Sequence, residues 1–206
     1  MVGWLGAVDA WARDRGLAVA AEPYEEREGR AAATAAGRRA ATRALAGLGG
    51  PAIAVGDRHD DGRPAWPPGF TGSISHAAGV AVAGVAPLAR ASSVGIDIEA
   101  RAALPLGDAA AALGPVERAW AAGRAGPDEA ATALWSAKEA AFKAWNERAA
   151  GALPAIEPDR HLLVELADDG GVTVTPLAEL AGAAAPITGH RWRLGDLLVT
   201  LVVSPP

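Results

Sequence analysis

The segment SVGIDIEAR places two carboxylates two positions apart in a short apolar run, and this restricts the fold more than any other part of the chain. In a strand, alternation puts Val94, Ile96 and Ile98 on one face. Asp97 and Glu99 then share the other face. Neighbouring like charges destabilise a strand unless a positive group lies between them, and a hard divalent cation with oxygen ligands suits that position. The alternative is an exposed strand end with both carboxylates in water.

A second charged segment follows about forty residues later, in LWSAKEAAFKAW. Glu139 and Lys143 are four positions apart, so they share one face of a predicted helix. A surface ion pair explains this spacing and stabilises a helix by about 0.3–0.5 kcal/mol. However, Lys138, Glu139 and Lys143 are surrounded by alanines. Three charges within six residues of an otherwise apolar helix favour the lining of a site.

The third segment is GFTGSISH, in which small hydroxyl side chains and an imidazole stand beside glycine. Hydroxyl and backbone N–H groups bind phosphate oxygens, and a histidine adapts its charge to the anion. Ser73, Ser75 and His76 are therefore candidates for an anion site. Read alone, a histidine at the start of a strand is more often an ordinary hydrogen-bonded residue.

The order and spacing of the three segments are more informative than any one of them. GSISH, VGIDIE and WSAKEAAFKA resemble the three signature blocks of the 4′-phosphopantetheinyl transferases. The resemblance is to the branch that includes the Sfp-like enzymes and, more closely, the EntD-like ones. An arginine-bearing helix, the run GRPAWP and the closing segment LGDLLVTLVV extend it from Arg27 to Val203.

Helix and antiparallel strand signals recur in both halves of the chain, which predicts an α+β fold. Helices are expected over 24–46 and 113–145, the second broken at Gly126 and Pro127. Strands are expected at 52–55, after His76, and at 93–99, 161–166, 172–175, 191–194 and 197–203. We expect two subdomains, 1–104 and 105–206. The resemblance implies that each is a small antiparallel sheet with a packed helix, and that a pseudo-twofold axis relates them.

Composition argues against several classes of protein. The 206-residue chain is 50% apolar, enough to form a core unaided, and it has no cysteine for disulfides or thiol chemistry. Its formal charge of −5 argues against a nucleic-acid binder. No basic leader is evident, and the longest apolar run, 77–89, is too short to span a membrane. We therefore expect a cytoplasmic protein without a membrane span.

The resemblance implies transfer of the 4′-phosphopantetheine arm from coenzyme A to a serine of an apo acyl or peptidyl carrier protein. Asp97, Glu99 and Glu139 match the family's metal ligands, and Mg²⁺ suits such a carboxylate site. Glu139 also matches the usual candidate for the general base, with Glu99 as the alternative. Lys138 and Lys143 match the two motif lysines. Lys143 would neutralise pyrophosphate oxygens, and Lys138 would assist proton movement or leaving-group charge.

The resemblance also implies contacts to coenzyme A. Ser75 and His76 match residues that hold its phosphates. Arg30 and Arg38, eight positions apart and near one helical face, match a pair that reaches the 3′-phosphate. Arg63 matches a basic residue near the adenine and ribose phosphates. For the arginines, the alternative is a helix whose charges are simply solvated.

Two other functions are compatible with the same residues. One is hydrolysis of coenzyme A or another nucleotide pyrophosphate, and the other is a non-catalytic domain that binds coenzyme A. The similarity to EntD-like enzymes favours nonribosomal peptide or siderophore synthesis over other carrier-dependent pathways such as polyketide synthesis. Because both halves of the predicted site lie in one chain, a monomer would suffice. Carrier docking is expected beside a basic or apolar patch, near the segment after the third block.

Overall fold

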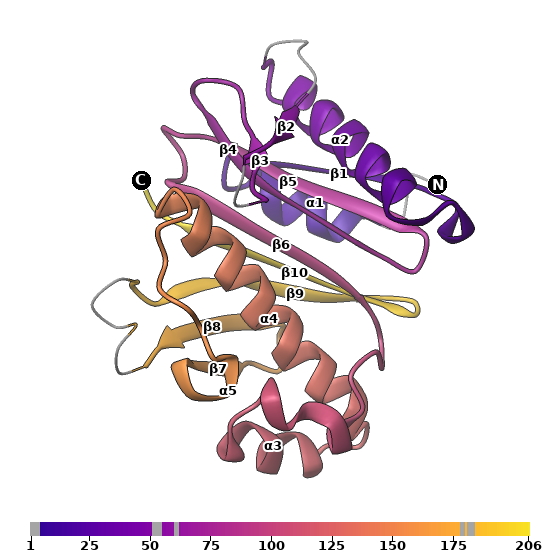
Figure 1. The fold of residues 1–206 in the computed structure, drawn as a ribbon, viewed down its shortest axis with the longest axis vertical. Coiled ribbons are helices and arrows are strands. Elements are labelled where there is room, and N and C mark those ends of the chain that lie inside the picture. Colours follow the sequence, from indigo (N-terminus) through magenta and orange to yellow (C-terminus); the bar gives the residue numbers. More distant parts are fainter. Residues whose placement is uncertain (1–4, 51–54, 60–61, 178–179, 181–183) are drawn as a thin grey trace.

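A computed structural model describes residues 5–50, 55–59, 62–177, 180 and 184–206, with the backbone alone for 56–58. The strand expected at 52–55 falls almost entirely outside the described residues. The fold is α+β, as predicted, with antiparallel sheets of three and five strands and helices packed against them (Figure 1). A short two-stranded sheet, β2–β3, precedes β4 in the chain.

The described elements occur along the chain as runs of helical segments separated by runs of strands. The helical segments are α1 (Gly6–Arg13), η1 (Glu26–Glu28), α2 (Gly29–Gly47), η2 (Leu106–Ala111), α3 (Pro115–Ala122), α4 (Pro127–Arg148) and α5 (Pro158–His161). The strands are β1 (Ala18–Pro23), β2 (Gly56–Arg58), β3 (Pro64–Ala65), β4 (Phe70–Ala77), β5 (Val80–Pro87), β6 (Ser93–Ala100), β7 (Leu162–Leu166), β8 (Gly171–Pro176), β9 (Ile187–Leu194) and β10 (Leu197–Ser204).

The three-stranded sheet has the order β1–β5–β4, and α2 packs on one of its faces (Figure 1). Gly37 allows this close packing, because a Cβ there would lie 2.6 Å from Cγ2 of Ile74 on β4. The expected helix over 24–46 is α2, preceded by the short helical turn η1. This packing holds the start of α2 near the end of β4, where GSISH lies.

The five-stranded sheet has the order β6–β10–β9–β8–β7, and β6 is its edge strand. Asp97 of β6 stands opposite Thr200 of β10. The boundary expected at residue 104 would assign β6 to the first subdomain, yet its hydrogen-bonded neighbour is β10 at the end of the chain. Gly95 lets α4 lie directly against β6, because a Cβ there would be only 1.8 Å from the carbonyl oxygen of Ala140.

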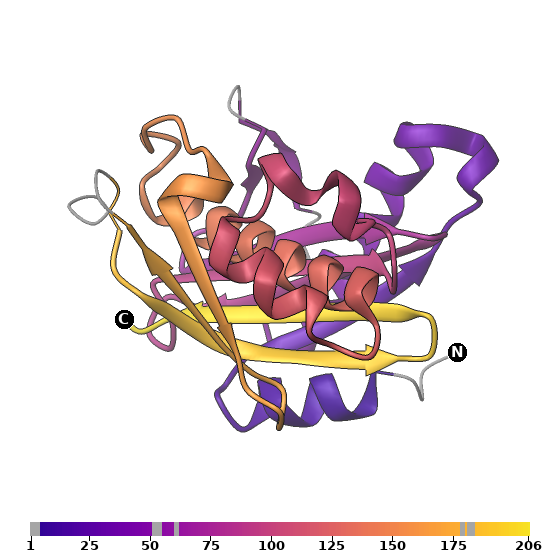
Figure 2. The ribbon, with the colours of Figure 1, turned by 90° about the horizontal axis from the view of Figure 1, so that it is seen from below.

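Alternation along β6 separates two environments, as the sequence predicts. Val94, Ile96 and Ile98 are buried in a cluster with residues of α1, β1 and β10. The other face of the strand carries Asp97 and Glu99 toward α4. Figure 2 shows that helices cover both sides of the five-stranded sheet: α3 and α4 lie on one side, and α1 lies on the other.

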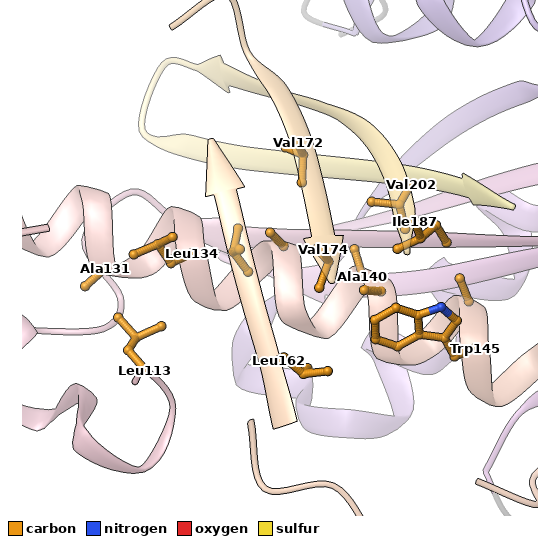
Figure 3. Packing of buried hydrophobic residues seen from close by; sticks show 14 of the residues in the cluster. Leu113, Ala131, Leu134, Ala140, Trp145, Leu162, Val172, Val174, Ile187 and Val202 are labelled. Atoms are coloured by element: carbon orange, nitrogen blue, oxygen red, sulfur yellow. The ribbon is translucent and has the colours of Figure 1, made fainter. Parts of the chain in front are cut away.

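The main core fills the space between α4 and the strands β7 to β10. Leu134 and Trp145 of α4 point toward the strands that carry Val174 and Ile187 (Figure 3). The indole N–H of Trp145 donates a hydrogen bond of 3.0 Å to the carbonyl oxygen of Ala185. The core therefore fixes the orientation of α4, the helix that carries the third sequence block. Within the described part of the chain, no helix is long and apolar enough to cross a membrane.

Candidate functional site

One cavity brings together most of the residues singled out from the sequence. It has a volume of about 630 Å³ and lies where β4, β6, α2 and α4 meet. We call it the phosphate cavity. The predicted site residues that line it are Arg30, Ser75, His76, Asp97, Glu99, Glu139 and Lys143. Three sequence blocks that are far apart along the chain thus contribute to a single site.

Asp97 and Lys143 form the centre of the polar network in this cavity. Asp97 is 3% exposed, and its Oδ1 accepts hydrogen bonds from Lys143 Nζ at 2.6 Å and from Ser75 Oγ at 2.9 Å. Lys143 Nζ also donates to Ser75 Oγ at 3.0 Å and to the carbonyl oxygen of Ile96 at 3.3 Å. The alternative of a surface pair between Glu139 and Lys143 does not describe the main contact of this lysine, because its ammonium reaches across to Asp97 on β6.

Glu99 and Glu139, which also line the cavity, hold their protons more tightly than ordinary carboxyl groups. Burial, followed by the charge of Asp97, raises the pKa of Glu99 from 4.5 to about 7. Burial also raises the pKa of Glu139, with Asp97 adding to the rise and Lys143 opposing it. Burial, more than the neighbouring charges, therefore favours the neutral form of both carboxyl groups.

The donor atoms of this site suit a hard cation. Asp97 Oδ2 is buried and has no hydrogen-bond partner among the described residues. Carboxylate oxygens are the ligands that Mg²⁺ takes from proteins, together with water and substrate phosphates. No group of three or more His, Cys, Asp or Glu side chains within the described ranges is arranged to hold a metal ion. Coordination by Asp97, Glu99 and Glu139 together would therefore need a rearrangement of their side chains.

The raised pKa of Glu99 predicts that stability depends on pH. The folded protein binds this proton more tightly than the unfolded chain, so the metal-free protein loses stability as the pH rises from 4.5 to about 7. We expect a loss on the order of 1–3 kcal/mol. Urea denaturation with EDTA, from about pH 5 to about pH 8, measures it. Glu99→Gln should remove this part of the slope, and an unchanged slope in that variant would contradict the assignment.

The residues expected to bind coenzyme A divide between two neighbouring cavities. Arg30, which is exposed, lines both the phosphate cavity and a second cavity of about 350 Å³ that includes Arg63. Arg63 Nη1 lies 3.4 Å from Glu147 Oε2 on α4. Arg38 is half-buried and is not among the described residues that line either cavity. The structure therefore places Arg30 and Arg63 beside the residues of β4 that were candidates for an anion site, while Arg38 is not part of the described lining of either cavity.

His76 is exposed at the edge of the phosphate cavity, and its ring meets an aromatic neighbour that we did not foresee. The Tyr24 ring packs edge-on against it, with ring centroids 6.0 Å apart. No motif marks Tyr24, which directly follows β1 in the part of the chain that precedes the resemblance. Its position depends on the pairing of β1 with β5, a long-range contact.

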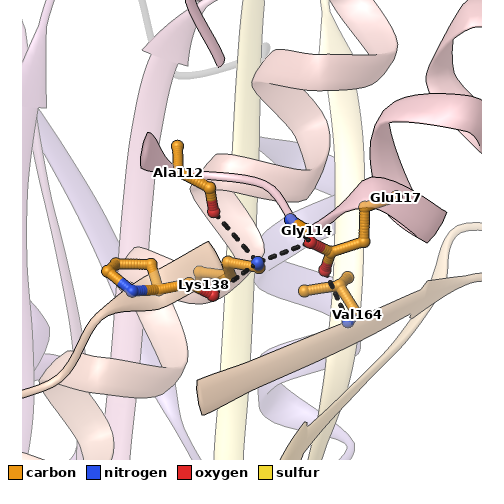
Figure 4. Close-up of polar contacts among 6 residues, drawn as sticks. Ala112, Gly114, Glu117, Lys138 and Val164 are labelled. Atoms are coloured by element: carbon orange, nitrogen blue, oxygen red, sulfur yellow. Dashed lines mark hydrogen bonds and ion pairs between the residues drawn. The ribbon is translucent and has the colours of Figure 1, made fainter. Parts of the chain in front are cut away.

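Lys138 lies in a different place from the one expected of a residue that assists the leaving group. Its side chain is 1% exposed, and its Nζ donates to Glu117 Oε2 at 2.6 Å. It also donates to the carbonyl oxygens of Ala112 at 3.0 Å and Pro158 at 2.8 Å (Figure 4). Glu117 Oε1 accepts from the backbone N–H of Val164 at 2.9 Å. This buried pair ties α3, α4, α5 and β7 together, and the phosphate cavity does not include Lys138.

The pairing of Lys138 with Glu117 is hard to predict from local sequence patterns. Glu117 stands three residues after Gly114, and its Oε2 accepts a hydrogen bond of 2.8 Å from the backbone N–H of Gly114. This local pattern is typical of a helix start. Nothing local indicates that its second role is to neutralise a lysine 21 residues later.

Comparison with known families agrees with this arrangement. A sequence profile described as the 4′-phosphopantetheinyl transferase superfamily matches residues 93–202, which is more than half of the 206-residue chain. The chain belongs to this superfamily. A second profile, described as the 4′-phosphopantetheinyl transferase N-terminal domain, matches residues 27–86. The narrower resemblance to the EntD-like branch stays a prediction.

Three curated proteins are similar to this superfamily member over part of its length. The 4′-phosphopantetheinyl transferase Svp of Streptomyces mobaraensis is 44% identical over 154 residues, which cover 69% of the chain and 59% of Svp. Npt of Nocardia iowensis is 41% identical over 108 residues, 52% of the chain and 48% of Npt. PptT of Mycobacterium tuberculosis is 41% identical over 92 residues, 42% of the chain and 38% of PptT. The chain thus spans about half the length of the curated relatives it matches.

A mainly apolar cavity of about 330 Å³ adjoins the phosphate cavity in this phosphopantetheinyl transferase superfamily member. Glu139 lines both cavities, so it stands between the charged site and the apolar one. Trp135 and Phe142 of α4 form one wall, and the segment that contains Pro154 and Ile156 forms the other. Lys138 Nζ donates a hydrogen bond to the carbonyl oxygen of Pro158, at the end of this second wall, and so holds that segment against α4.

Proposed function

We propose that this protein transfers the 4′-phosphopantetheine arm of coenzyme A to a serine hydroxyl of an apo acyl or peptidyl carrier protein, with Mg²⁺. The observation that carries the proposal is the phosphate cavity, in which Asp97, Glu99 and Glu139 stand around Lys143 in a member of this superfamily. Buried carboxylates beside a lysine and hydroxyl groups suit the positioning and charge neutralisation of a transferred phosphoryl group.

In the proposed reaction, the serine oxygen attacks the phosphorus that carries the pantetheine arm. A new P–O bond forms as the bond to the bridging oxygen breaks, and adenosine 3′,5′-bisphosphate leaves with the bonding electron pair. The serine proton passes to a carboxylate of the enzyme. Bound Mg²⁺ would supply neutralisation of the negative pyrophosphate oxygens, and Asp97, Glu99 and Glu139 would hold it.

Glu139 is the proposed base for the serine proton. It lies between the phosphate cavity and the apolar cavity, and burial raises its pKa toward the working range of a general base. Glu99 is the alternative, because its pKa of about 7 also suits that task. Lys143 would turn from Asp97 toward the pyrophosphate oxygens, which accept from its ammonium.

Coenzyme A would be held by groups from both halves of the chain. Ser75 and His76 would donate to its phosphates from the end of β4. Arg30 and Arg63 would reach the 3′-phosphate side through the cavity that they share. Arg38 would join them only if the helix or the ligand moved, because it lines neither cavity among the described residues.

Carrier docking is proposed beside the apolar cavity, where Phe142 is exposed and the segment around Ile156 forms a wall. The carrier serine would then approach Glu139 from the side opposite the coenzyme A phosphates. A monomer would suffice for this arrangement. The carrier is proposed to serve nonribosomal peptide, siderophore or polyketide synthesis, and the reaction to take place in the cytoplasm.

Intact mass spectrometry of an apo carrier protein tests this function. The protein is mixed with coenzyme A, Mg²⁺ and the carrier, with and without EDTA. We expect the carrier to gain the mass of one phosphopantetheine arm only when Mg²⁺ is free. Cleavage of coenzyme A without carrier modification would indicate a hydrolase instead. Intact coenzyme A that binds without turnover, across acyl and peptidyl carriers, would indicate a non-catalytic binding domain.

A further inference from the structure

Another polar cavity, distinct from those described above, lies away from the phosphate cavity on a different face of α4. It has a volume of about 240 Å³ and is formed by the end of α3, the first turns of α4, and residues of β7, β9 and the turn after β7. Glu129 lines it, ten residues before Glu139, so the two sites are roughly 15 Å apart along the helix. We call it the arginine pocket, because Arg124 and Arg191 line it.

Arg191 brings a positive charge to this pocket, where Glu129 and Asp168 are its opposite charges. It is half-buried on β9, and its Nε is buried and makes no hydrogen bond to any described residue. Burial lowers its pKa, yet a guanidinium keeps its charge at every physiological pH. A buried N–H group without a hydrogen-bond partner is costly, so an anion that accepts from this Nε–H would offset that cost. Arg124 lies nearby, with its guanidinium 4.1 Å from the centre of the Trp120 ring.

The acidic groups of the pocket neutralise these two arginines only in part. Glu129 is already shared by two other arginines, with Oε2 3.2 Å from Arg101 Nε and Oε1 3.6 Å from Arg193 Nε. Asp168 is exposed, so water screens its charge. With Arg101 and Arg193, which contact Glu129 but do not line the pocket, four arginines stand against two carboxylates, so this cluster is locally cationic on a chain with a formal charge of −5.

We propose that the arginine pocket binds a small oxyanion, a phosphate or carboxylate group, through the guanidinium groups of Arg124 and Arg191. Guanidinium forks match the paired oxygens of both groups and form charge-assisted hydrogen bonds with them. The volume is below the roughly 300 Å³ at which pockets begin to hold drug-sized ligands, so the ligand is a small anion rather than coenzyme A. This site is separate from the proposed transfer reaction and does not depend on it.

The test is an NMR titration of the full chain with inorganic phosphate at constant ionic strength. The Nε–Hε resonance of Arg191 is followed, and Arg191→Lys identifies it by its disappearance. We expect a saturable shift with a dissociation constant on the order of 1 mM. Because the readout is local to Arg191, phosphate bound in the phosphate cavity does not produce it. A parallel titration with acetate decides between phosphate and carboxylate ligands, and saturation by either anion supports the proposal.

Two variants that retain Arg191 serve as test and control. Arg124→Gln should weaken binding about tenfold, because it removes one of the two charge-assisted contacts. Arg118→Gln lies on the same helix α3 but does not line the pocket, so it should bind phosphate as the parent does. A shift that stays linear, or that chloride reproduces at equal ionic strength, overturns the proposal. Equal binding by Arg124→Gln and Arg118→Gln also overturns it.

Discussion

Glu139→Gln is expected to reduce carrier modification by roughly a thousandfold, while the protein stays folded. General base catalysis contributes about 10²–10⁴-fold, and a neutral amide neither accepts the serine proton nor serves as a charged metal ligand. The substitution keeps the size of the side chain and removes a charge that burial disfavours. Turnover is measured by mass spectrometry of the carrier, and folding is measured by urea denaturation.

Glu165→Gln is the matched control, because Glu165 is an exposed carboxylate on β7, outside the phosphate cavity. Its turnover should equal that of the parent. A Mg²⁺ titration separates the two proposed roles of Glu139: lost metal affinity is overcome at high Mg²⁺, whereas a lost base is not. If Glu139→Gln turned over at the parent rate, the base would lie elsewhere, and Glu99→Gln would be the next variant to measure.

The parts of this site that could be predicted from the sequence depend on local geometry. The two-residue repeat of a strand places Asp97 and Glu99 on one face, and the structure shows Ile96 and Ile98 on the other. Helical spacing places Glu139 and Lys143 on one face of α4, and both line the phosphate cavity. These relations hold within one element, so they need no knowledge of the tertiary fold.

The relations that could not be predicted connect distant elements. Lys143 is four residues from Glu139, yet its shortest contact is with Asp97, 46 residues earlier. The first elements, α1 and β1, carry no motif, although β1 completes the three-stranded sheet. The environment of Arg191 depends on α3, α4 and β9 at once. Propensity and spacing do not report contacts of this kind, because the partner of each side chain is set by packing.

Lys138 shows the difference between the two kinds of relation most clearly. Its place in the third sequence block groups it with Glu139, whereas the helix turns its side chain into a buried pair with Glu117. We expect Lys138→Met to lower the free energy of unfolding by about 3–5 kcal/mol, because it leaves the Glu117 carboxylate buried without its cation. The Glu117 side chain is 2% exposed, so water does not replace the lost partner. Urea denaturation at neutral pH measures the change.

The double variant Lys138→Met with Glu117→Gln separates structure from catalysis. Removing both charges should recover a large part of the lost stability, because a buried pair is costly mainly when one partner remains. The recovery should be incomplete, because the N–H groups of Gly114 and Val164 donate to different carboxylate oxygens and glutamine keeps an oxygen for only one of them. If Lys138 acts only by holding the wall of the apolar cavity that ends at Pro158, the double variant should regain turnover along with stability. A double variant that is stable yet inactive toward every carrier would instead return Lys138 to the reaction itself.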